Sequence, residues 1–368
     1  MVKSSRNYGI DMLRIIAMLG VVVLHVLGHG GILDSVTTPV DRSVAWFFEI
    51  LAFPAVNCFV LISGYVGYRG EKYYPGLKNI ISIFLTVLFY SVSICLIFKF
   101  FFLTPVNKID LLNSFIPMTS KQYWFFSAYF GMFLLSPFLN MIVHRSSKKQ
   151  SFIFLLFIVL ASCCSVYCDP FSLSGGYGLC WLILLYCVGA VMKKYDLAAL
   201  LSSGKWAVIA FLSFMATWLI KIYTFSMRDS LLKMLFEGMA SYVSPLMLLA
   251  TVGWVSSFSR MAFRKINPKV MSFFSTSAFS VYLIHDNVYV RKCAIVKSYE
   301  FAVINNSFTL ILSIICEALI IFLACILIDK VRILLFKLLK ADKISEKAEE
   351  VIKNVVNKIY EKFDSLVS

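Results

Sequence analysis

The chain has 368 residues, of which 60% are hydrophobic and only 15% are charged, and its formal net charge is +15. Soluble domains are about 45–50% apolar, so this composition excludes an ordinary soluble globular protein and indicates a multispanning membrane protein. In a soluble chain the positive charge would point to nucleic acid. Here we assign it to a basic rim facing anionic lipid headgroups and expect no nucleic-acid partner.

Ten stretches are long and apolar enough to cross a bilayer as helices, which takes roughly 20 residues each. The predicted fold class is therefore an all-α membrane protein, with about ten transmembrane helices enclosing a polar cavity. The ninth stretch is the weakest because it is rich in hydroxyl side chains. The predicted spans are 10–32, 44–67, 79–101, 122–143, 151–168, 177–192, 205–225, 238–257, 270–289 and 308–328.

The distribution of lysine and arginine predicts the orientation of these helices. With both termini inside, 24 of these residues lie in inner segments and 10 in outer segments. Inner loops carry an excess of Lys and Arg, so we expect a multi-pass protein of the cell membrane with both termini in the cytoplasm. The first apolar run is too long for a secretory signal, and no small-residue cleavage site follows it.

Residues 340–368 form a second predicted unit after a transmembrane domain at 1–339. Apolar residues recur there at helical spacing, and the unit carries six Lys and six Asp or Glu. This pattern predicts an amphipathic helix that lies on the membrane or pairs with another chain. Because the charges cancel, a simple polybasic lipid anchor is not supported. The apolar positions are Ile344, Ala348, Val351, Ile352, Val355, Ile359 and Phe363.

The first span, which contains LRIIAMLGVVVLHVLGHGG, carries ionisable residues on one face. Arg14 and His25 are eleven residues apart, which on a helix is a rotation of about 1100° and a rise of about 16 Å. They therefore share a face, and Asp11 and His29 join it at spacings of three and four. Ionisable residues in a span usually face a cavity, so we predict that this stripe lines one.

Three interpretations of the stripe remain open at this point. A long anionic donor such as acyl-CoA could place its phosphates at Arg14 and its thioester at His25, which would act as a general base. A proton or anion path in a transporter or flippase would also use aligned Arg and His. The purely structural alternative is that Arg14 pairs with Asp11 near the headgroups while the histidines bond buried hydroxyls.

Metal binding is not expected. His25 and His29 have the spacing of a helical metal pair, but no Glu follows His25 as in H-E-x-x-H. The ten cysteines contain no C-x-x-C pair, and most lie inside apolar runs. They are typical of small buried hydrophobic residues rather than of a zinc site or a disulfide framework.

Four stretches in order give the sequence a resemblance to a known family. They are GIDMLRIIAMLGVVVLH, AVNCFVLISGYVGYRGEKYYPGLKNI, YWFFSAYFGMFLLSPFLN and STSAFSVYLIHDNV. Together they resemble the acyltransferase-3 family of integral membrane acyltransferases, which includes O-acetyltransferases of bacterial surface polysaccharides. The likeness extends from about residue 8 to about residue 328.

The resemblance implies about ten spans and transfer of an acyl group, commonly acetyl, from cytoplasmic acyl-CoA to a sugar hydroxyl on the far side. It implies that His25 is the catalytic histidine and that Arg14 contacts the donor. The family's Arg-x-x-Arg loop reads Arg69-Gly-Glu-Lys72 here, which keeps the charge but loses the second bidentate fork. We expect the CoA phosphates near Arg69, Lys72 and Lys78.

Other polar residues in the spans are candidates for the cavity. His285 either lines the acceptor side near His25 and His29 or sits at the interface beside Tyr282. Glu317 is a lone carboxylate in mid-span, which is costly unless it has a partner. Trp124 fits an interfacial aromatic belt better, with a role in the cavity as the alternative. Glu49 and Asn57 are further candidates with less support.

The sequence therefore predicts an O-acyltransferase of the membrane, with acetyl-CoA as donor substrate, no metal, and a cell-surface or lipid-linked glycan as acceptor. The alternative is a multispanning transporter or flippase that uses Arg14 and His25 as a proton or anion path.

Overall fold

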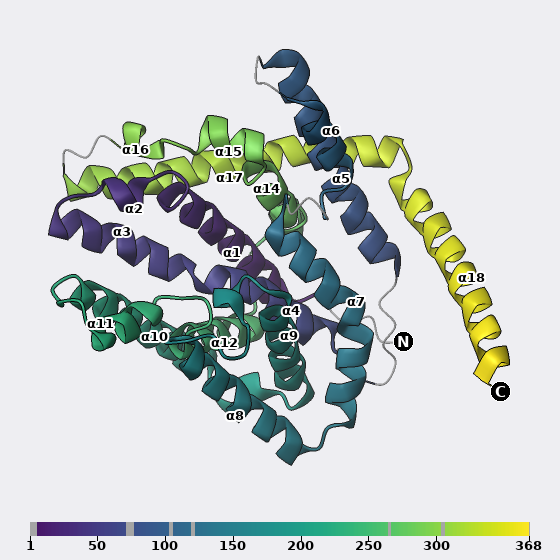
Figure 1. The fold of residues 1–368 in the computed structure, drawn as a ribbon, viewed down its shortest axis with the longest axis horizontal. Helices are drawn as coiled ribbons and strands as arrows, with labels where there is room; N and C mark the ends of the chain where they lie inside the picture. Colours follow the sequence, from purple (N-terminus) through teal and green to yellow (C-terminus); the bar gives the residue numbers. More distant parts are fainter. Residues whose placement is uncertain are drawn as a thin grey trace.

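The computed structural model describes residues 6–70, 77–102, 106–118, 122–263, 266–302 and 306–367, and every regular element in these ranges is helical (Figure 1). The all-α fold class is thus confirmed for the part of the chain that is described. Lys72 of the predicted donor loop lies outside these ranges.

Among the residues described, seven helical segments are long and apolar enough to cross a membrane. One of them, Pro39–Gly67, is bent where α3 ends and Pro54 begins α4, since proline cannot continue the hydrogen-bond ladder. The segments are α1 (Tyr8–Leu27), α3 with α4 (Pro39–Ala52, Pro54–Gly67), α5 (Leu77–Phe101), α7 (Trp124–Arg145), α8 (Lys148–Ser165), α10 (Ser203–Thr224) and α17 (Ser307–Leu338).

The other three predicted spans correspond to shorter helices. Those at 177–192 and 238–257 appear as α9 and α12, each of 16 residues. The hydroxyl-rich ninth span is broken at Thr276 and Ser277 into α13 and α14, of eight residues each. The remaining helices are α2 (Ile32–Ser35), α6 (Lys108–Phe115), α9 (Leu179–Lys194), α11 (Leu231–Gly238), α12 (Pro245–Arg260), α13 (Pro268–Ser275), α14 (Ala278–His285), α15 (Val288–Ala294), α16 (Ser298–Phe301) and α18 (Ala341–Val367), with 3-10 turns at Ser174–Gly176 and Leu197–Leu200.

Helix α1 lies at the centre of the bundle. It packs against α3, α4, α12, α13, α14 and α17, so its sides are covered by segments from both halves of the sequence. Its apolar residues Leu13, Ala17 and Val22 are fully buried. In contrast, α17 leaves large apolar side chains such as Ile320 exposed along its length, as expected of a helix that faces lipid. Polar groups on α1 are therefore held inside protein.

Close backbone contact joins α4 to α9. A Cβ atom at Gly64 would lie 1.9 Å from the carbonyl oxygen of Tyr186, and one at Gly189 would lie 2.1 Å from that of Leu61. Small residues let membrane helices approach closely enough for dispersion contacts between backbones. Gly64, the first glycine of the GYVGY segment, therefore has no side chain because α9 leaves no room for one.

We predict that Gly64→Ala destabilises the protein by roughly 1–3 kcal/mol, because the added methyl group forces α4 and α9 apart. Thermal unfolding in detergent, followed by tryptophan fluorescence, measures this as a lowered midpoint. The matched control is Gly204→Ala in α10, where nothing lies within 4 Å of the added Cβ. Equal midpoints for the two variants would contradict this account of the contact.

Candidate active site

A cavity of about 300 Å³ lies beside the C-terminal turns of α1. Its walls come from α1, α3, α4, α7, α14 and α15 and from the segments that carry Tyr177 and Tyr242. Ionisable and aromatic side chains share this lining with a few aliphatic ones. The polar and aromatic lining residues are His25, His29, Glu49, Phe59, Trp124, Phe125, Tyr177, Tyr242, Phe279, Tyr282, Asp286 and Arg291.

The end of α1 sets the positions of the two histidines. The helix begins at Asn7, whose side chain accepts a hydrogen bond from the Ile10 N–H, and it ends at Gly28. Gly31 then adopts a left-handed conformation with φ of 76°, which glycine tolerates without a steric penalty. His25 consequently lies in the last helical turn, and His29 lies in the turn just beyond it.

The end of α14 is held by side chains from other segments. The Tyr123 hydroxyl donates to the Leu283 carbonyl at 3.0 Å, and the Asn287 side-chain amide donates to the Tyr123 oxygen at 2.9 Å. All three residues are buried. The segment between Leu283 and Asn287, which carries His285 and Asp286, is thereby held against Tyr123 at the start of α7.

His25 and His285 form a direct pair across 260 residues of sequence. The Nδ1 atom of His25 lies 2.9 Å from Nε2 of His285, and Nδ1 of His285 lies 2.6 Å from the Val281 carbonyl oxygen. A carbonyl only accepts hydrogen bonds, so Nδ1 of His285 must carry a proton. His285 is completely buried, which favours its neutral ring and leaves Nε2 as an acceptor.

This chain of bonds fixes the tautomer of His25. Because Nε2 of His285 accepts, Nδ1 of His25 must donate, and neutral His25 then has its lone pair on Nε2. A histidine held in this way can remove a proton through Nε2, which is the arrangement that a general base requires. His285 thus orients His25 as a carboxylate or carbonyl does in other histidine-based sites.

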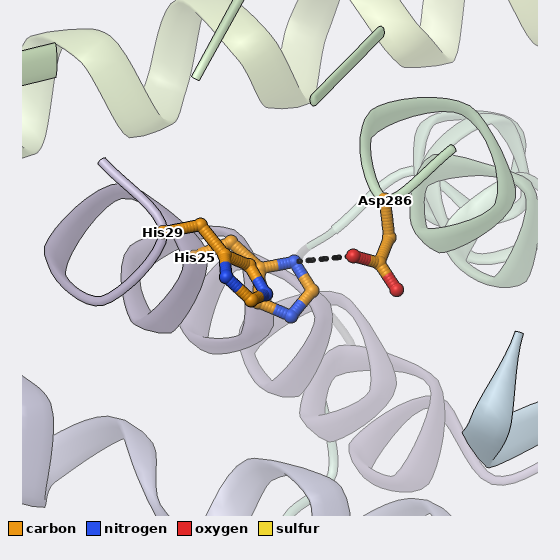
Figure 2. A group of neighbouring side chains, drawn as sticks. All are labelled: His25, His29 and Asp286. Atoms are coloured by element: carbon orange, nitrogen blue, oxygen red, sulfur yellow. Dashed lines mark ion pairs between the residues drawn. The ribbon is translucent and has the colours of Figure 1, made fainter. Parts of the chain in front are cut away.

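A charged group completes the site (Figure 2). Oδ1 of Asp286 lies 3.7 Å from Nδ1 of His25 and 3.1 Å from the Arg291 guanidinium. The ring of His29 packs against that of His25, with centroids 4.9 Å apart and the ring planes tilted by 47°. Burial and the nearby Arg291 lower the pKa of His29, which lies beyond the end of the first span. The Asp286 carboxylate is placed to stabilise His25 when that ring becomes protonated.

The same residues bear on whether a metal could bind. One ligand atom each from His25, His29 and Asp286 fall within 4.8 Å of one another. However, Arg291 already pairs with the carboxylate and lies 3.4 Å from Nε2 of His29. A metal ion there would face a fixed positive charge, so this donor set fits a cation poorly.

Comparison with protein families assigns the chain. A family model described as an acyltransferase domain, Acyl_transf_3, matches residues 7–330. The chain belongs to the acyltransferase-3 family. No match was found among the curated proteins or among the solved structures. The match begins at the first residue of the α1 cap and ends within α17, so it includes every residue of the cavity described above.

In this acyltransferase the half of the predicted stripe nearer the N-terminus is separate from the cavity. Asp11 bonds Arg14 at 3.2 Å and Arg6 at 2.5 Å, and Arg6 also donates to the hydroxyl of Ser275. The ion pair offered above as the structural alternative for Arg14 is therefore present. The Arg14 side chain still leaves 34% of its surface exposed, so part of it remains accessible.

The other predicted donor residues that the structure describes lie after the end of α4 and in the first turn of α5. Arg69 is exposed just beyond the end of α4. Lys78 is half-buried and forms an ion pair of 2.7 Å with Glu346 of α18. A phosphate group binding at Lys78 would have to compete with that carboxylate.

The acceptor candidates divide between two cavities. Tyr282 and Trp124 line the His25 cavity, and Trp124 packs against Tyr177 with centroids 4.6 Å apart. Glu317 instead accepts a hydrogen bond from Ser298 and lines a second, apolar cavity of about 590 Å³ on the other side of His285. The structure therefore brings His25, His29, His285, Tyr282 and Trp124 together and leaves Glu317 apart.

Among the ionisable residues of the site, Asp286 and Arg291 were not predicted from the sequence, and Glu49 was given too little weight. Asp286 directly follows His285 in YLIHDN, and this adjacency was the available signal. Arg291 was counted only as one of the ten basic residues in the predicted outer segments. Glu49 is buried in the cavity wall, and its Oε2 atom has no hydrogen-bond partner among the described residues.

Proposed function

We propose that this acyltransferase moves an acetyl group from cytoplasmic acetyl-CoA to a hydroxyl of a cell-surface or lipid-linked glycan. The observation that supports this proposal most strongly is the His25–His285 pair, which gives His25 a basic Nε2 atom in a cavity large enough for a small part of a substrate. The family supplies the reaction class.

The proposed reaction needs one base and one site for developing charge. Nε2 of His25 removes the proton of the acceptor hydroxyl as its oxygen attacks the thioester carbonyl. The C–S bond then breaks, and the proton on His25 passes to the sulfur of the departing CoA. Nδ1 of His25 keeps its bond to His285 throughout, and the Asp286 carboxylate offsets the transient positive charge.

The donor is proposed to enter from the end of α1 that carries Arg14. That residue and His25 are separated by about 16 Å along the helix, which suits a long arm with phosphates at one end and a thioester at the other. Arg14 is partly accessible and Arg69 is exposed, and guanidinium binds phosphate oxygens in a bidentate manner. We expect this end to face the cytoplasm, together with both termini.

The acceptor is proposed to occupy the part of the cavity opposite the histidines. Trp124, Tyr177 and Tyr242 provide aromatic surface there, and Glu49 provides a buried carboxylate oxygen without a partner. A buried polar atom without a hydrogen bond costs free energy unless a ligand satisfies it. A sugar ring meets both demands, because its C–H face packs on aromatic rings and its hydroxyls donate to carboxylates.

We predict that His25→Ala lowers acyl transfer by about 10²–10⁴-fold, the usual contribution of a general base. The assay is incorporation of labelled acetate from acetyl-CoA into glycan, in membranes where the variant accumulates normally. The second variant pair is His285→Phe and His285→Gln. The glutamine carbonyl can accept the bond from His25, so His285→Gln is expected to retain more activity than His285→Phe. Full activity of His25→Ala would refute the role of this residue.

We predict that Glu49→Gln raises the KM for the acceptor by about tenfold through loss of one hydrogen bond to the carboxyl group, with the KM for acetyl-CoA unchanged. The acceptor in this assay is surface glycan from the producing cells, stripped of esters by mild alkali. Glu317→Gln, in the other cavity, is the matched control. An unchanged acceptor KM in Glu49→Gln would exclude Glu49 from the acceptor site.

A further inference from the structure

Helix α18 continues beyond the body of the protein with one apolar face uncovered. It starts after a left-handed residue, Lys340, whose φ of 52° turns the chain away from the axis of α17 (Figure 1). From position 350 to position 366 every residue of α18 is exposed. The exposed apolar residues include Phe363, with 60% of its surface accessible, and Ile359, with 63%.

The apolar residues of α18 occupy a continuous arc. At about 100° per residue they fall within about 140° of the helix circumference, which is wide for a helix face. The only charged side chain inside this range is Lys362, and the other charged residues lie outside it. The residues of this arc are Ile344, Ala348, Val351, Ile352, Val355, Val356, Ile359, Phe363 and Leu366.

The first turns of α18 show which way this arc points. Ser345, which lies on the same side as the arc, is buried where α18 packs against α5. Lys353 and the backbone N–H groups of Lys78 and Leu77 lower the pKa of the Glu349 carboxyl, which therefore sits at the start of α5. Helix α5 runs from this point into the membrane, so one edge of the arc lies against α5 at the membrane surface.

We propose that the apolar arc of α18 lies in the interfacial layer of the leaflet that contains the start of α5 and the end of α17. The helix begins three residues after a membrane-spanning helix ends, so it is held at the membrane surface. It has six Asp or Glu against five Lys. Its binding therefore depends on apolar area rather than on anionic lipid, and Lys362 can extend its ammonium group to the headgroups.

A second copy of this chain is the competing occupant, and the pattern favours it less. A two-stranded coiled coil uses a narrow seam of residues that repeats every 3.5 positions. The arc of α18 is wider than such a seam and is interrupted by Lys362. An interfacial helix, in contrast, needs a broad apolar face with polar groups at its margins.

Photo-crosslinking of the full-length protein tests this proposal. p-Benzoylphenylalanine replaces Phe363 or Ile359 within the arc, and Asn357 or Glu350 on the opposite face as matched controls. The protein is reconstituted in vesicles of phosphatidylcholine, alone or mixed with phosphatidylglycerol, that carry a labelled phospholipid. After irradiation the lipid adduct is quantified on the protein band.

We expect at least about fivefold more lipid adduct from the arc positions than from the controls, and equal adduct in the two lipid mixtures. Val355→Asp, added to the protein that carries the crosslinker at position 363, removes apolar area from the arc. It is expected to reduce the adduct, while the protein remains in the vesicles. A band at twice the monomer mass from the arc positions would show a second copy there instead. Equal or absent adduct from both faces would show that α18 projects into water, and either result overturns the proposal.

Discussion

The hydrogen bond between His25 and His285 is the constraint on which the rest of the site depends. It joins a helix near the start of the chain to one near its end. Through a single backbone carbonyl, that of Val281, it determines which two of the four ring nitrogens carry a proton. A histidine without such a partner can expose either nitrogen as base. With it, His25 has one defined basic atom, and that atom belongs to a residue lining the cavity.

Much of the surrounding fold serves to keep this bond in place. Helix α1 is buried by helices from both halves of the chain, so His25 has a fixed backbone. The second histidine is carried by a short helix whose end is tied to Tyr123 and Asn287. A continuous span at 270–289 would continue past this point. Instead α14 ends at His285, and the break at Asp286 and Asn287 before α15 lets Asp286 line the cavity.

The sequence predicted those features of the site that follow from helical spacing within one segment. Asp11, Arg14, His25 and His29 share one face because α-helical geometry requires it, and the pairing of Asp11 with Arg14 follows from their spacing of three. A position of His285 near His25 was one of two predicted alternatives, but their direct hydrogen bond could not be predicted, because it depends on a contact across 260 residues. The count of ten spans is not confirmed: seven segments of the described chain are long enough, and the other three predicted spans are shorter or broken helices, which hydropathy alone does not locate.

Direct observation of the His25 tautomer tests the central claim. The chain has four histidines, so protein labelled with ¹⁵N at histidine gives few imidazole signals, and His25→Asn identifies those of His25 by their loss. In reconstituted protein at mildly alkaline pH, the account predicts a protonated Nδ1 and an unprotonated Nε2 for His25. A protonated Nε2 would leave no basic atom facing the substrate and would contradict the account.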